Sequence, residues 1–157
     1  KWHPLFHAIS MIALPMIMSA YAGVADSARA RALELVRKKP ITGHTVSLVG
    51  RMENAFMTMD VACDQMIGIA ETSTPGPATT HRSLFARMLA GRSAIETVER
   101  AMEAVGGVCF YRDVGLERTF RDVQGARFHP LPEAQQLVFT GRVELGLPPI
   151  VGPAAAG

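Results

Sequence analysis

The chain has 157 residues, of which 48% are hydrophobic and 6% aromatic, and its formal net charge is +2. This length is enough to bury a hydrophobic core without a disulfide or a bound metal. The weak charge and the scattered arginines exclude a nucleic-acid-binding surface, which would concentrate basic side chains on one face. Because the apolar residues are chiefly Ala, Val, Leu, Ile and Met, the composition favours helices packed on helices over a sandwich or a barrel.

The first predicted helix starts near Leu5 and ends before Pro40. Its apolar positions recur every three to four residues, as on one face of a helix: Phe6, Ile9, Ala13, Met16, Ala20, Val24, Ala28, Ala32 and Leu35. Residues 5–25 carry no charged side chain apart from His7, so a signal peptide or a short membrane span is an alternative. Because the run continues unbroken into an Arg-rich stretch, we expect instead the most buried helix of the fold, and no membrane partner.

Two more long helices and a shorter one follow. The second has apolar positions Val49, Met52, Phe56, Met59, Cys63, Met66 and Ala70, and the third has Leu84, Met88, Ile95, Val98, Met102 and Val105. The fourth begins near Pro132 and carries Leu137, Val138, Gly141 and Val143. We predict an all-α fold: an antiparallel four-helix bundle over residues 1–147, with an additional loop region (Gly115, Gly125, Pro130) before the last helix, and a flexible tail at 148–157.

The cysteines and histidines indicate no metal site. Cys63 and Cys109 lie in apolar surroundings without metal-ligand spacing, which favours two buried, reduced thiols and a cytoplasmic protein. Among the histidines, the pair His3 and His7 has the spacing of ligands on one helix face, but it falls at the expected frayed start of the chain.

The densest polar stretch is residues 106–122. Two interpretations are open from the residues alone. Gly106 and Gly107 could open a helix end so that the backbone approaches a ligand, with the following Glu and Arg pairs locking a loop. Alternatively, the glycines end a helix in the ordinary way and a solvated charged loop follows.

The same stretch resembles the C-terminal domain of the acyl-CoA dehydrogenase family, whose members show Gly-Gly-x-Gly-Phe, then a Glu-Arg or Glu-Lys pair, then Arg-Asp. The matching residues are Gly106, Gly107, Phe110, Glu117, Arg118, Arg121 and Asp122. The resemblance implies a parent flavoprotein that oxidises an acyl-CoA thioester in fatty acid metabolism. It also implies N-terminal and middle domains ahead of this one, a homo-oligomer (dimer or tetramer), and an isolated domain that is inactive.

The resemblance also implies contacts with FAD. In the family, an Arg after the first helix reaches the pyrophosphate, and Arg37 occupies that position; a guanidinium suits phosphate because it donates two parallel hydrogen bonds. The Gly-Gly pair approaches the adenosine side of a flavin bound across a subunit interface, and Gly106 and Gly107 match it. Glu103 stands where the family has Gln.

The residue at the family's catalytic position differs in this chain. Dehydrogenation needs a carboxylate base for the α-proton while the flavin takes the β-hydride. In one branch that Glu follows the Arg-Asp arginine by nine residues, which reaches Pro130 here. A local shift would bring in Glu133 instead, and a second branch carries its base on an earlier helix, where Glu53 is an exposed candidate.

His129 leads to a different chemistry. It lies one residue before the expected Glu, where flavin-dependent monooxygenases of the same fold carry a His. The alternatives to a dehydrogenase domain are therefore a monooxygenase with His129 near the flavin, or a non-catalytic assembly subunit that only packs against an active partner.

Overall fold

The computed structural model describes residues 3–150, and within them it is helical with no strand. The α-helices are α1 (Leu5–Val36), α2 (Gly43–Thr72), α3 (Pro77–Val105), α4 (Leu116–Val123) and α5 (Glu133–Glu144). Three short 3-10 helices, η1 (Gly107–Phe110), η2 (Arg112–Val114) and η3 (Gln124–Arg127), connect the last elements. The predicted all-α fold is confirmed, while most of the predicted tail, residues 151–157, lies outside the described part.

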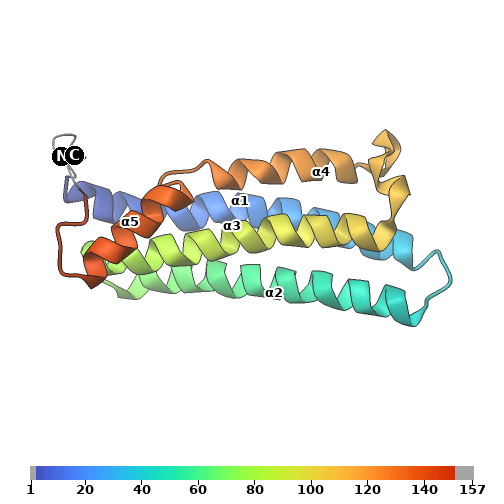
Figure 1. Ribbon diagram of the computed structural model, residues 1–157, viewed down its shortest axis with the longest axis horizontal. Coiled ribbons are helices and arrows are strands. Elements are labelled where there is room, and N and C mark those ends of the chain that lie inside the picture. The colour runs from blue at the N-terminus through green and yellow to red at the C-terminus, as the bar shows by residue number, and fades with distance from the viewer. Residues whose placement is uncertain (1–2, 151–157) are drawn as a thin grey trace.

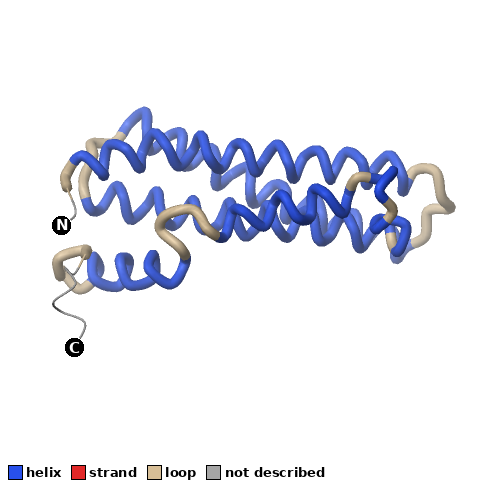
Figure 2. The backbone as a smooth tube through the Cα atoms, turned by 90° about the horizontal axis from the view of Figure 1, so that it is seen from above, coloured by secondary structure: helices blue, strands red, loops and turns tan. Residues whose placement is uncertain are grey.

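The three long helices lie side by side with alternating direction, so that the C-terminal ends of α1 and α3 meet at one end of the molecule (Figure 1). The short helix α4 packs on both α1 and α3, and α5 lies obliquely across α3. Seen from above, short loops join the helices, and α5 is offset from the long ones (Figure 2).

The prediction of a loop region before the last helix is wrong in detail, because this segment contains α4. Its ends are anchored by Leu116 and Val123, both buried. The Glu and Arg residues expected to lock a loop are instead helical neighbours: Arg121 pairs with Glu117 at 3.0 Å, and Arg118 lies 3.6 Å from the Asp122 carboxylate. Four-residue spacing puts such partners on the same exposed helix face.

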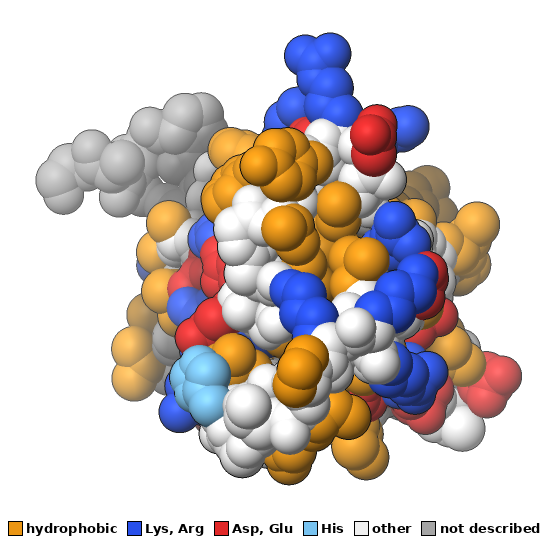
Figure 3. All heavy atoms as spheres, turned by 90° about the vertical axis from the view of Figure 1, so that its right-hand side faces the viewer, with side chains coloured by type: hydrophobic (Ala, Val, Ile, Leu, Met, Phe, Trp, Pro, Cys, Tyr) orange, Lys and Arg blue, Asp and Glu red, His pale blue; other side chains and the backbone are white. Residues whose placement is uncertain are grey.

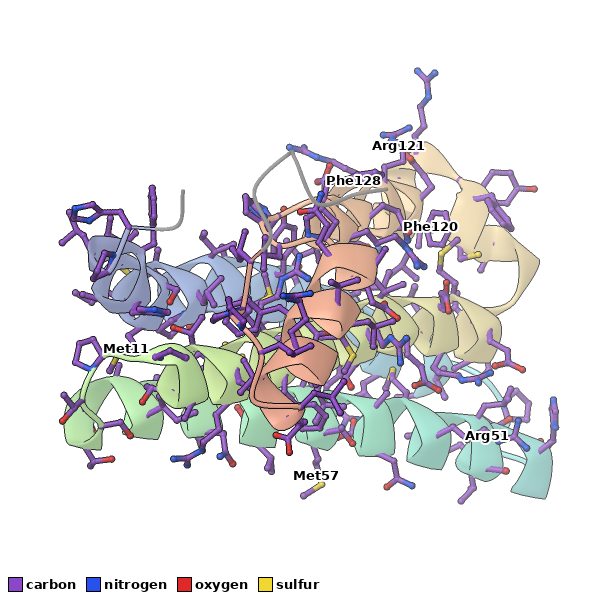
Figure 4. All side chains as sticks on the ribbon, turned by 60° about the vertical axis from the view of Figure 1, so that its left-hand side comes forward. Met11, Arg51, Met57, Phe120, Arg121 and Phe128 are labelled. Carbon is purple, nitrogen blue, oxygen red and sulfur yellow. The ribbon has the colours of Figure 1, made fainter. Side chains whose placement is uncertain are left out.

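The predicted core positions of α2 and α3 are largely confirmed. Met52, Met59 and Met66, each seven residues from the next, are almost fully buried in the core, whereas Met57 of the same helix points away from the other helices (Figure 4). Cys63 and Cys109 are buried and unpaired, as predicted. Burial raises the pKa of the Cys63 thiol, which keeps it protonated.

The prediction for the first half of α1 is wrong. Three expected core positions, Phe6, Ile9 and Met16, are exposed. The core is formed from the opposite side of the helix, by Met11, Leu14, Pro15 and Met18. This stretch has few polar residues, His7, Ser10 and Ser19, and none is charged apart from His7, so apolar spacing could not select a side.

Burial along the helices also differs from expectation. The most extensively buried helix is α3, not α1. In α5, Leu137 and Val138 are exposed, whereas Gln136 and Phe139 are buried. Among the described residues, α1 alone is long and apolar enough to cross a membrane, and 28% of its most apolar stretch is buried in the fold. Core helices of soluble proteins and signal sequences satisfy the same criterion.

Candidate functional site

His129 lies in the turn between η3 and α5, and the middle of α1 holds its side chain. The Tyr21 hydroxyl is 2.7 Å from His129 Nε2. The two rings meet edge to face, with their centroids 5.3 Å apart and their planes at 62°. A residue on the first helix and a residue 108 positions later are thus joined in one pair.

Arg87, on α3, holds the backbone of the same turn. Its side chain is 3% exposed, and its Nη2 donates to the carbonyl oxygens of Ala126, at 2.9 Å, and His129, at 2.7 Å. Burial lowers the pKa of Arg87, yet a guanidinium stays protonated in proteins. A buried cation therefore connects α3 to both ends of the segment 126–129.

Gly125 provides the space that the Tyr21 hydroxyl occupies. A Cβ atom at this position would lie 2.6 Å from the Tyr21 oxygen, closer than real Cβ contacts allow. Glycine is the residue that permits this approach, since any side chain would displace the hydroxyl from His129.

The two carboxylates considered as bases are engaged elsewhere. Glu133, at the start of α5, forms a two-point ion pair with Arg92 on the surface of α3. Glu53 accepts from Arg29 Nε at 2.8 and 2.9 Å across the contact of α1 and α2. The expected position of the family base holds Pro130, which has no titratable group, so no carboxylate takes the place of the base beside His129.

An apolar groove of about 330 Å³ begins at the residues that follow His129. Pro130 and Leu131 form one wall, and the first half of α1 and the start of α3 form the others. The remaining lining residues are Phe6, Ile9, Ser10, Ala13, Leu14, Ile17, Thr80 and Leu84. Its surface is nearly free of charge, so it suits an apolar group.

The predicted FAD-contacting residues lie together at the end of the bundle where α1 and α3 finish. Arg37 is the exposed C-cap of α1, and Gly106, at φ +79°, ends α3. Lys39 Nζ donates to the Val105 carbonyl at 2.8 Å and so connects the two helix ends. Figure 3 faces this end and shows Lys and Arg side chains gathered on it.

This end of the bundle suits a phosphate-bearing cofactor. No atom lies within 4 Å of a Cβ built on Gly106 or Gly107, so the backbone is open to a ligand. The charge of Glu103 is compensated, because Arg100 donates to it at 2.9 Å. These residues therefore offer exposed basic groups and accessible backbone, and the one carboxylate among them, Glu103, is paired.

The two sets of predicted site residues do not meet. At a rise of about 1.5 Å per residue, Tyr21 and Arg37 are about 24 Å apart along α1. His129 and Glu133 thus lie near the middle of the bundle, while Arg37, Glu103, Gly106 and Gly107 lie at its end. Within residues 3–150, no three His, Cys, Asp or Glu side chains are grouped to hold a metal ion.

Sequence reasoning missed Tyr21, Arg87 and Gly125. One signal was present for Arg87: it falls three residues after Leu84 and four before Gly91, on the face of the third helix that is buried. Tyr21 and Gly125 carry no such signal, because their contacts join segments that are far apart in the sequence.

Solved structures share this fold. A structure of KijD3 in complex with dTDP superposes with a TM-score of 0.80 at 20% identity and covers 94% of this chain and 41% of that one. The HsaA monooxygenase from M. tuberculosis gives 0.76 at 18% identity, covering 90% and 40%. The 3-HSA hydroxylase from Rhodococcus sp. RHA1 gives 0.78 at 17% identity, covering 91% and 39%. The chain thus spans about two fifths of these proteins, and the likeness shows the fold alone.

The sequence itself identifies the family. No curated protein matches it significantly. The family model described as the acyl-CoA dehydrogenase C-terminal domain, however, matches residues 8–131, which include most of α1, all of α2 to α4 and the turn carrying His129. The chain therefore belongs to the acyl-CoA dehydrogenase C-terminal domain family.

Proposed function

We propose that this chain is the C-terminal domain of a flavin-dependent monooxygenase of the family, with His129 as its acid-base residue. The observation that carries the proposal is the pair formed by His129 and Tyr21 at 2.7 Å, beside a proline where a dehydrogenase would have its base. The names of the structural neighbours support it, since they include a monooxygenase, a hydroxylase and a nitrososynthase.

The alternative activity, dehydrogenation of an acyl-CoA, needs a carboxylate within hydrogen-bond reach of the α-proton. Pro130 offers none, and Glu133 is paired with Arg92. The Arg92 guanidinium occupies both oxygens of the Glu133 carboxylate. Glu133 would have to leave Arg92 before it could accept a proton, which weakens the case for it as the base.

The proposed cofactor is a flavin, with FAD as the form that the family resemblance implies. One of the similar structures, of KijD3, contains FMN. Arg37, Gly106 and Gly107 would hold a phosphate group of the cofactor at the basic end of the bundle. When bound in its reduced form, a flavin supplies activation of molecular oxygen, of which one atom enters the substrate and the other leaves as water.

The groove beside Pro130 and Leu131 supports an apolar substrate group. His129 precedes these lining residues directly, so a molecule in the groove would lie close to the turn that carries the imidazole. The histidine can hold or move a proton for such a molecule, since an imidazole has both a donor and an acceptor nitrogen. A thioester of coenzyme A remains the substrate of the alternative activity.

The assembly that we propose is a homo-oligomer, dimer or tetramer, whose remaining domains complete the site. The 24 Å between the two residue sets, estimated from a rise of about 1.5 Å per residue, supports this. The basic end and the His129 turn of one chain would contact distant parts of one dinucleotide. Alternatively, they would contact two different cofactor molecules of the oligomer. A role in packing alone, without flavin, is the remaining alternative.

The test compares His129→Gln with Glu133→Gln in the full-length, flavin-loaded protein. Oxygen uptake is measured with externally supplied reduced flavin. We expect His129→Gln to lower the rate by roughly 10²-fold or more, as for loss of an acid-base group, and Glu133→Gln to change it only by a factor of a few. A large loss with Glu133→Gln and none with His129→Gln would overturn the proposal.

A further inference from the structure

We infer that Tyr21 is a positioning residue for His129: its hydroxyl donates to Nε2 and so holds the imidazole in the tautomer that carries its proton on Nδ1. The role of this tautomer in catalysis rests on the proposed function, whereas the hydrogen bond between Tyr21 and His129 does not depend on it. The nitrogen left free to serve a ligand would then be a donor, Nδ1–H.

The direction of the hydrogen bond follows from acidity. A phenol is a much stronger acid than the N–H of a neutral imidazole, so at 2.7 Å the hydroxyl is the donor and the unprotonated ring nitrogen the acceptor. Within residues 3–150, the Tyr21 hydroxyl has no other hydrogen-bond partner. In a histidine, the bond made by one ring nitrogen decides which nitrogen bears the proton.

Independent contacts hold both partners in place. Arg87 fixes the backbone of His129 through its carbonyl oxygen, at 2.7 Å, and the Tyr21 ring meets the imidazole edge to face. Gly125 leaves the space for the hydroxyl, and a methyl group there would lie 2.6 Å from it. Three elements, α1, α3 and η3, thus position one hydrogen bond.

The experiment reads the tautomer directly. In the full chain with ¹⁵N-labelled histidine, long-range ¹H–¹⁵N correlation spectra distinguish Nδ1–H from Nε2–H, and His129→Gln identifies the His129 signals. We expect the Nδ1–H form in the unmodified chain. In Tyr21→Phe, we expect the population to move to the Nε2–H form that predominates for a histidine in water.

Two further variants separate this effect from general disturbance of the fold. Gly125→Ala should shift the tautomer as Tyr21→Phe does, because its methyl group displaces the hydroxyl. Gly23→Ala, on the same helix as Tyr21 but with no atom within 4 Å of the new methyl group, should not. Tyr111→Phe, at the only other tyrosine of the chain, is the matched control.

Each outcome decides the question. An Nε2–H signal in the unmodified chain, or an unchanged tautomer in a folded Tyr21→Phe, overturns the inference. The proposed function fails separately, if His129→Gln leaves oxygen uptake unchanged while the tautomer behaves as expected.

Discussion

The first half of α1 and the middle of α3 depart from the usual relation between polarity and burial in opposite ways. On α1, Leu5, Ile12 and Met16 face outward, and on α3, Arg87 and Thr97 are buried. Each of those buried polar residues has a partner: Arg87 donates to the carbonyls of the turn, and the Thr97 hydroxyl donates to the Ser93 carbonyl at 2.7 Å. Because α3 is packed against every other α-helix of the described chain, contact rather than hydropathy decides what it buries.

The largest expected effect comes from two methionines on α1. Met18 is 1% exposed and Met16 is 70% exposed. Met18→Ala should lower the free energy of unfolding by about 2–5 kcal/mol, because it leaves a cavity in the core. Met16→Ala should change it by no more than about 0.5 kcal/mol. Chemical denaturation of both variants measures the difference, and equal losses would show that the exposed face of α1 is buried in solution.

A second pair compares arginines on α3. Arg87→Met leaves two carbonyl oxygens of the His129 turn without their donor and should cost about 3 kcal/mol. Arg92 is 60% exposed and pairs with Glu133 on the surface, so Arg92→Met should cost at most about 1 kcal/mol. Thermal or urea unfolding provides the comparison. A small loss with Arg87→Met would mean that the turn does not depend on α3.

The smallest effect is the pH dependence of the contact between α1 and α3 made by His7. Its Nδ1 lies 2.7 Å from the Thr80 hydroxyl, and burial lowers the pKa of His7. The folded chain therefore binds this proton less readily than the unfolded chain, so stability falls as pH drops below about 6.5.

The contribution of His7 to this slope is at most about 1.4 kcal/mol per pH unit. His7→Gln should flatten the dependence of the unfolding free energy on pH, whereas His44→Gln, at an exposed position, should leave it unchanged. An identical slope in the chain and in His7→Gln would contradict the assignment.

The sequence predicts the buried side of a helix where charged residues separate the apolar positions. In α2, charged residues separate the apolar positions, and Met52, Met59 and Met66 are correctly assigned to the core. In the first half of α1, polar residues are too few to show which side is buried. In α5, the predicted Leu137 is exposed while a polar residue, Gln136, is buried.

The candidate site could be predicted only in part. The positions of His129 and Arg37 follow from the family resemblance, because motifs are contiguous in sequence. The contact of Tyr21 with His129 could not be predicted, since it depends on how α1 lies against the turn that follows η3. The space at Gly125 has meaning only once that hydroxyl is in place.

The most direct test of the account is anaerobic titration of the flavin-loaded, full-length protein with acyl-CoA thioesters from butyryl- to palmitoyl-CoA. A monooxygenase domain with His129, and no carboxylate base, predicts that the absorbance of the oxidised flavin stays unchanged in the absence of oxygen. Bleaching of the flavin by any of these thioesters would show dehydrogenation and contradict the central claim.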